Sequence, residues 1–218
     1  MAVIVPAVLA TDISQYRRYI EVYNNFAKRI QVDITDGEFA QNQTIDESNI
    51  WWNKDQTTCD VHMMVTNPSK HLQTIIKVNP SLCIFHCEVS EDLIPIFDKL
   101  KEAGIKTGVA FLKQTYPGSE KFKKYIEAAD HALIFSGKLG LQGGEADLLQ
   151  TEKVEIIRSI KSNIEIGWDG GANLSNVRAL AHSGIDVINV GSAISHAQNA
   201  PEAFKQLTEE LDKNGVVL

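Results

Sequence analysis

The sequence predicts an α/β fold, a single (β/α)8 barrel of the TIM type. Short runs rich in β-branched and aromatic residues alternate with longer amphipathic runs along the 218 residues, which makes eight strand–helix units. No Pro- or Ser-rich linker and no shift of composition separates these units, so we expect one barrel domain over residues 1–218. A doubly wound open sheet is the alternative, but eight units without a second domain suit a closed barrel better.

The expected strands are short and mostly apolar, as strands between outer helices and a packed interior should be. They cover residues 3–7, 29–34, 58–65, 82–87, 105–111, 131–136, 164–169 and 186–190. In the second strand, Ile30, Val32 and Ile34 fall on one face. Gln31 and Asp33 fall on the opposite face, so this strand packs against helices on one side and faces a polar site on the other.

The expected helices follow the strands, with apolar residues spaced three and four apart. They cover residues 12–28, 91–103, 119–128, 153–162, 174–183 and 201–211, with one helix opening at Asn67-Pro68 and a short helix at 47–53. Proline suits a first helical turn, and Gly104 and Gly184 are typical helix stops. Two long loops, 36–48 and 137–145, interrupt the pattern, and loops of this length in a compact domain are usually functional.

The composition disfavours several classes of protein. Hydrophobic residues make up 44% of the chain, which suits a large core and argues against disorder. The net charge is −7 and no Lys/Arg-rich run occurs, so we expect no nucleic-acid partner. The first apolar run lacks a positive flank and is broken by Pro6, and no apolar stretch approaches the length of a membrane helix. We therefore expect a cytoplasmic protein without a membrane partner.

The chain has three cysteines, Cys59, Cys83 and Cys87. A zinc site at Cys83 and Cys87, with His86 between them, is one interpretation of this spacing. The stronger one is that these small apolar side chains pack against helices in a reducing compartment.

Polar residues near the strand ends predict an active site, because the site of such a barrel lies at the carboxyl ends of its strands. Asp33 and Asp169 come from the second and seventh strands, on opposite sides of the mouth, and His62 comes from the third with Met64 on the same face. Two opposed carboxylates suit proton removal from one face of a carbon and delivery to the other. A divalent metal held by Asp33, His62 and Asp169 would stabilise the enolate charge. The alternatives are helix capping or ion pairing by the aspartates and a hydrogen-bonded core position for His62.

Glycines in two loops predict a phosphate site. Gly170 and Gly171 follow the seventh strand, and Gly191 and Ser192 follow the eighth. In barrels these two loops often bind phosphate through backbone N–H groups, and glycine allows its oxygens to approach closely. Two ordinary tight turns are the alternative interpretation.

Several motifs together resemble the ribulose-phosphate 3-epimerase family. They lie in order over nearly the whole chain, at residues 6–12, 32–39 with Asn42 and Thr44, 60–65 with Asn67-Pro68, 85–88, 108–110, 169–171 and 191–194. That family is a (β/α)8 barrel that inverts carbon 3 of D-ribulose 5-phosphate to give D-xylulose 5-phosphate.

The resemblance implies a role for each matching residue. Asp33 and Asp169 would be the acid/base pair and, with His62, the ligands of a divalent metal of the Zn, Fe, Mn or Co type that supports a cis-enediolate. A small phosphorylated sugar would be the partner. Its binding residues would be His62, Met64, Gly140, Gly143, Gly170, Gly171, Gly191 and Ser192. The loop 137–145 would close over it, and a homo-oligomer is expected.

The chain departs from the family pattern at five positions. Gln31 replaces a second metal-binding histidine of the family, Ala7 replaces a serine, Thr35 a methionine and Leu139 a proline. Gln142 interrupts a glycine-rich run. A glutamine carbonyl can bind a hard cation but is a poor substitute for imidazole on zinc. The alternatives are therefore a related ketose-phosphate epimerase, for example for allulose 6-phosphate, or an impaired phosphosugar-binding paralogue.

A decarboxylase or aldolase on the same barrel is disfavoured. Related phosphosugar decarboxylases carry an Asp-x-Lys-x-x-Asp pattern on the second strand, whereas Asp33 is followed here by Ile34-Thr35-Asp36.

Overall fold

A computed structural model describes residues 2–211 and 213. Its strands form a closed parallel barrel in chain order, and the last strand pairs with the first, with Val3 opposite Val187. The strands are β1 Val3–Leu9, β2 Arg29–Thr35, β3 Thr58–Met64, β4 Leu82–His86, β5 Lys106–Phe111, β6 His131–Phe135, β7 Glu165–Asp169 and β8 Val187–Val190. This closure confirms the predicted (β/α)8 barrel and excludes the open sheet.

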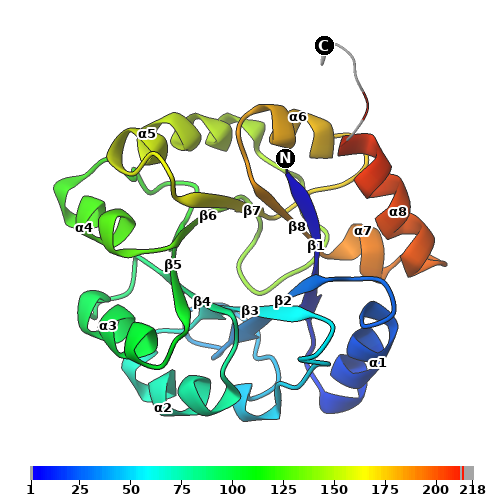
Figure 1. Ribbon diagram of the computed structural model, residues 1–218, viewed down its shortest axis with the longest axis horizontal. Helices are drawn as coiled ribbons and strands as arrows, with labels where there is room; N and C mark the ends of the chain where they lie inside the picture. Colours follow the sequence, from blue (N-terminus) through cyan, green and yellow to red (C-terminus); the bar gives the residue numbers. More distant parts are fainter. Residues whose placement is uncertain (1, 212, 214–218) are drawn as a thin grey trace.

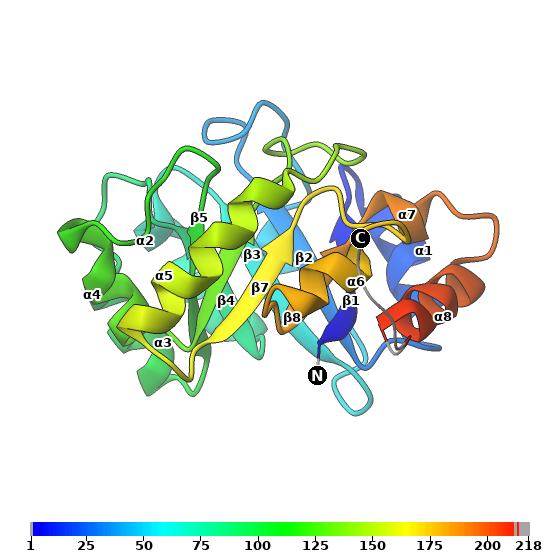
Figure 2. The same ribbon diagram turned by 90° about the horizontal axis from the view of Figure 1, so that it is seen from above.

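Helices surround the ring of strands (Figure 1). They are α1 Ile13–Tyr23, α2 Pro68–Val78, α3 Ile94–Glu102, α4 Glu120–Ala128, α5 Lys153–Ile160, α6 Val177–His182, α7 Ser192–Ser195 and α8 Ala200–Leu211, with 3-10 turns η1 Glu47–Asn49 and η2 Leu148–Glu152. The loops after β2 and β6 lie at one end of the barrel, opposite the N-terminus (Figure 2). None of the helices in the described part of the chain is long and apolar enough to cross a membrane.

The element boundaries differ from the sequence prediction at several places. The first helix ends at Tyr23 rather than at 28, since the amides of Asn25 and Phe26 bond to carbonyls three residues back. The helix expected from 174 begins at Val177, because the Asn173 side chain accepts the amide of Ser175 and turns the chain.

Other boundaries also move. The helix predicted at 91–103 begins at Ile94, the short helix predicted at 47–53 ends at Asn49, and the first strand continues to Leu9, which pairs with Asp33. The turns α7 and η2 were not predicted, since they are too short to show a periodic pattern.

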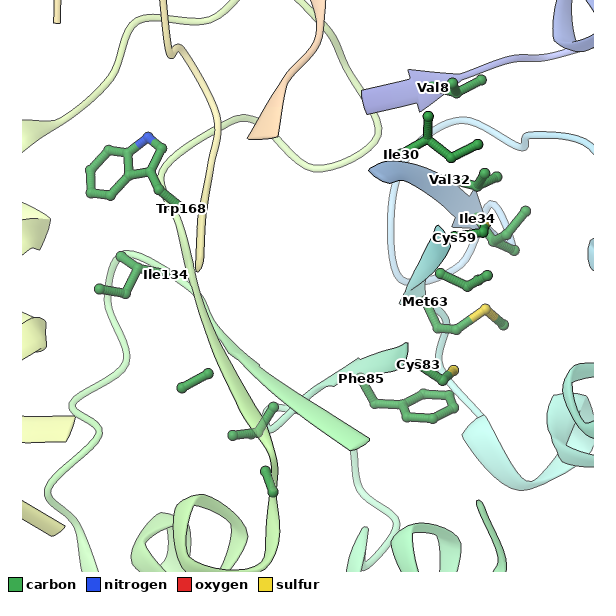
Figure 3. Close-up of a cluster of buried hydrophobic side chains, with 14 of the residues drawn as sticks. Val8, Ile30, Val32, Ile34, Cys59, Met63, Cys83, Phe85, Ile134 and Trp168 are labelled. Carbon is green, nitrogen blue, oxygen red and sulfur yellow. The ribbon is translucent and has the colours of Figure 1, made fainter. Parts of the chain in front are cut away.

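Apolar side chains fill two layers. The larger layer lies between strands and helices and contains Val32, Met63, Phe85 and Trp168 (Figure 3). A smaller cluster, Leu82, Ile84, Ala110 and Leu133, fills the barrel interior. The three cysteines are free and buried, as predicted, and all belong to the outer layer.

A group of ion pairs closes the amino-terminal end of the barrel. The Arg29 guanidinium donates to Asp60 at 2.7 Å and to both carboxylate oxygens of Glu165 at 2.8 and 2.9 Å. His131 Nδ1 lies 2.8 Å from the same Glu165. Strands β2, β3, β6 and β7 are thereby linked at the end opposite the candidate site.

Candidate active site

The carboxylates of Asp33 and Asp169 meet at the carboxyl ends of β2 and β7. They are joined by Gln31, whose Nε2 donates to Asp33 Oδ1 at 2.8 Å and to Asp169 Oδ2 at 2.6 Å. The three side chains point into the barrel because alternate residues of β2 and β7 face inward, while Val32 and Trp168 face the helices. Gln31 is fully buried, and the residues Asp33 and Asp169 are 6% and 9% exposed.

His62 lies beneath the two carboxylates. Its Nδ1 is 3.2 Å from Asp33 Oδ1 and 3.3 Å from Asp169 Oδ2. Its Nε2 is 2.9 Å from Nε2 of His86, whose Nδ1 is 3.3 Å from Glu88. A row of polar side chains therefore leads from the carboxylates through β3 and β4 to Glu88.

The charges along this row follow from burial and hydrogen bonding. Burial and the charge of Asp169 raise the pKa of Asp33 to about 6. Burial would lower the pKa of His62, but its hydrogen bonds to the two aspartates raise it to about 9. Burial lowers the pKa of His86 to about 4. Without a metal, these shifts favour a protonated His62, whose Nε2–H would donate to a neutral His86.

Asp33, His62 and Asp169 can hold a metal ion. One ligand atom from each lies within 4.8 Å of the others. Two carboxylates and an imidazole are a common donor set for divalent transition metals. Gln31 turns its amide nitrogen to this group, while its Oε1 is buried and finds no hydrogen-bond partner among the described residues.

A cavity opens directly above the carboxylates. Its walls include all but one of the residues predicted for the site, namely Asp33, Met64, Gly140, Gly143, Asp169, Gly170, Gly171, Gly191 and Ser192. His62 is the exception, because it is fully buried behind the aspartates and contacts them instead. Ala7, where the sequence resemblance implies a serine, also lines the wall.

The loop 137–145 covers this cavity, and Figure 1 shows it extending over the centre of the ring. It is held at its ends by Ser136, whose N–H donates to Asp169 O and whose Oγ accepts the N–H of Asp147. The remaining volume is about 40 Å³, far below the ~300–1,000 Å³ of typical ligand sites. A ligand of typical size therefore needs this loop to move before it can enter.

Two of the glycines allow the loop to approach. Gly170 and Gly171 have φ values of 110° and 73°, which favour glycine. A Cβ on Gly170 would lie 2.0 Å from the Gly137 nitrogen, and one on Gly171 would lie 2.1 Å from the Ala146 nitrogen. These glycines are therefore required by loop packing, whatever else they bind.

Sequence reasoning missed two features of the site. Asn189 on β8 lines the cavity, is 2% exposed, and has an Oδ1 without a partner among the described residues. A polar residue inside an apolar strand, two positions before Gly191, was the available signal. Gln142 reaches over Gly191, and no local pattern indicates this contact.

The comparisons with known proteins fit this geometry. A family model described as the ribulose-phosphate 3-epimerase family matches residues 3–195. The chain belongs to this family. It is 28% identical to ribulose-phosphate 3-epimerase of Schizosaccharomyces pombe, over 97% of this chain and 95% of that one. It is 29% identical to the cytoplasmic isoform of ribulose-phosphate 3-epimerase of Oryza sativa, again over 97% and 95%.

Solved structures with similar folds are more distant in sequence. A 3-hexulose-6-phosphate synthase from Salmonella typhimurium has a TM-score of 0.71 at 15% identity and covers 95% of this chain and 97% of its own. KGPDC from Streptococcus mutans has a TM-score of 0.72 at 12% identity, with 96% of this chain and 97% of that one covered. At these identities the likeness concerns the barrel fold alone.

Proposed function

We propose that this protein is a pentulose-phosphate 3-epimerase that interconverts D-ribulose 5-phosphate and D-xylulose 5-phosphate. The observation that carries the proposal is the pairing of Asp33 with Asp169 at one cavity, from strands on opposite sides of the barrel mouth. Membership of the family supports the same reaction.

The two carboxylates would act on opposite faces of carbon 3. One carboxylate, in its ionised form, takes the proton from the carbon next to the ketone, and the other, which carries a proton beforehand, returns that proton from the opposite side. A pKa of about 6 suits Asp33 to this work, because the group is ionised at neutral pH yet basic enough to accept a proton. Without a metal, the positive charge of His62 beneath both groups stabilises the carboxylate that is ionised. A metal ion held by a neutral His62 would supply that positive charge instead.

The donor set fits a divalent metal ion, which Asp33, His62 and Asp169 would hold. When bound, the ion would polarise the substrate oxygens and stabilise negative charge on them. Gln31 fits such an ion if its amide turns by a half rotation, which would present the unpartnered Oε1. A set of two carboxylates, one imidazole and one amide oxygen favours Mn²⁺ or Fe²⁺ over zinc.

The substrate phosphate would lie on the loops after β7 and β8. Gly170, Gly171, Gly191 and Ser192 line that side of the cavity, and backbone N–H groups in glycine-rich turns suit phosphate oxygens. Met64 would contribute an apolar wall, being buried at the end of β3. The loop 137–145, with Gly140 and Gly143, would open for entry and close over the bound sugar.

The substrate can be identified by direct comparison of two ketose phosphates. Purified protein, supplied in turn with Mn²⁺, Fe²⁺, Co²⁺ and Zn²⁺, is incubated with D-ribulose 5-phosphate or D-allulose 6-phosphate, and products are followed by NMR. We expect the larger kcat/KM for the pentulose phosphate. A preference for the hexulose phosphate would select the related epimerase, and no conversion of either would contradict the proposal.

A second candidate function is phosphosugar binding without turnover. Its basis is the Gln31 amide, which donates to both carboxylates where the family has a metal-binding histidine, together with Ala7 in the cavity wall. This candidate predicts that D-ribulose 5-phosphate raises the melting temperature, as any ligand of the folded state does, while no product forms.

The cytoplasmic location and the homo-oligomer stay predictions from the sequence.

A further inference from the structure

The side chain of Gln142 lies in the phosphate-binding part of the cavity. Gln142 belongs to the covering loop and lines the cavity together with Gly191 and Ser192. A Cβ on Gly191 would lie 3.3 Å from Gln142 Nε2 and 3.5 Å from its Cδ. The amide thus lies beside Gly191, one of the glycines whose backbone would meet a phosphate group.

Ser195 contacts the oxygen end of this amide. Its hydroxyl donates to Gln142 Oε1 at 3.2 Å, from the last residue of α7. With the oxygen engaged, the NH₂ group must point the other way, toward the cavity. Gln142 Nε2 is buried and has no acceptor among the residues that the structure describes.

A buried amide donor without an acceptor is costly. An anion in the cavity would supply the acceptor, and hydrogen bonds to charged groups are about twice as strong as neutral ones. We propose that Gln142 is a phosphate-binding residue of the loop, donating from Nε2 to the bound phosphate while Ser195 holds its Oε1. This inference rests on the proposed function for the identity of the ligand as a ketose phosphate.

The assignment gives the loop a direct role in recognition. The amide belongs to the loop that must open for entry. Its hydrogen bond to the phosphate would form only when the loop is closed, so bound phosphate would stabilise the closed loop. A glycine at position 142, the family pattern, would offer only its backbone N–H. The phosphate would therefore be bound by a side chain from above and by glycine backbone from below.

The test measures binding rather than turnover. Inorganic phosphate and D-ribulose 5-phosphate are titrated calorimetrically into the wild type, Gln142→Leu and Ser195→Ala. Gln142→Leu keeps the size but removes the donor, and we expect roughly 10- to 100-fold weaker binding of both ligands. Ser195→Ala should weaken binding less, and Ser195→Thr, which keeps the hydroxyl, should restore it. Gln73→Leu, at an exposed position of α2, is the matched control and should bind like the wild type.

The outcomes separate this inference from the proposed reaction. Equal phosphate binding by the wild type and Gln142→Leu would overturn it, and so would tighter binding by the variant, which would mean that the side chain blocks the site. A wild type that binds neither ligand would overturn it as well. Binding that depends on Gln142 but is accompanied by no epimerisation would support this assignment and contradict the epimerase.

Discussion

The amide nitrogen of Gln31 donates a 2.6 Å hydrogen bond to Oδ2 of Asp169, between residues 138 positions apart in the chain. The bond crosses the mouth of the barrel from β2 to β7, and the same nitrogen also reaches Asp33. Gln31 thus holds the two candidate catalytic carboxylates together, at a position where the sequence resemblance implies a metal-binding histidine. How strongly this site binds metal is therefore the main chemical question about the protein.

Replacing Gln31 by histidine should raise the affinity for metal. Loss of an outer partner of a metal site typically costs 10–100-fold in affinity, so the added imidazole should gain at least about tenfold. The variant and the wild type are dialysed against Zn²⁺ or Mn²⁺, and bound metal is measured by elemental analysis. Gln73→His, which adds a histidine to the exposed face of α2, is the control. Equal metal content in Gln31→His and the wild type would show that Gln31 does not limit binding.

Removing one carboxylate should leave a protein that exchanges hydrogen on only one face of carbon 3. Asp33→Asn and Asp169→Asn should each lose epimerisation by about 100-fold or more, since a proton must be both taken and returned. Any remaining exchange of the carbon 3 hydrogen should involve one epimer in Asp33→Asn and the other in Asp169→Asn. Deuterium incorporation from each purified epimer measures this. Exchange of the same epimer in both variants would contradict opposed carboxylates.

The activity should depend on pH through Asp33. Its pKa is raised to about 6, and only the ionised form accepts a proton. The kcat/KM measured without added metal should therefore fall as pH drops below about 6 and level off above it, and an added ion held by Asp33 should shift the fall to lower pH. Circular dichroism over the same range would verify that the fold persists. A flat profile between pH 5 and 8 would mean that another group is the base.

The ion pairs at the amino-terminal end should matter for stability. Arg29→Ala leaves Asp60, whose side chain is 3% exposed, without its cation. Breaking such a buried pair should lower the free energy of unfolding by about 3 kcal/mol. Lys205→Ala removes a pair with Glu209 whose side chains are more than 60% exposed, and should change stability by less than about 0.5 kcal/mol. Urea unfolding compares the two, and equal losses would disprove the argument.

The sequence pattern within single strands and loops was sufficient to predict the barrel and the positions of the two aspartates. The alternation in β2 placed Asp33 inward, because side chains alternate between the faces of any strand. The count of strand–helix units then put Asp169 across the mouth from it. Both aspartates line one cavity in the structure. Such features depend on backbone geometry within a single element and on chain order.

Contacts between distant segments could not be predicted in the same way. The bond between Ser195 and Gln142 joins residues 53 positions apart, and it depends on how the covering loop folds back over α7. From sequence, Gln31 indicates only that a second histidine ligand of the metal is missing. The structure adds that its amide donates to both carboxylates, which follows from the inward direction of three side chains rather than from any one of them.

The most direct test of the central claim is hydrogen exchange at carbon 3. The wild-type protein is incubated with D-ribulose 5-phosphate in heavy water, with each of the divalent metals Mn²⁺, Fe²⁺, Co²⁺ and Zn²⁺. We predict that deuterium enters carbon 3 and that D-xylulose 5-phosphate forms at the same time. Absence of exchange with every added metal would contradict the assignment of Asp33 and Asp169 as an acid/base pair acting on this substrate.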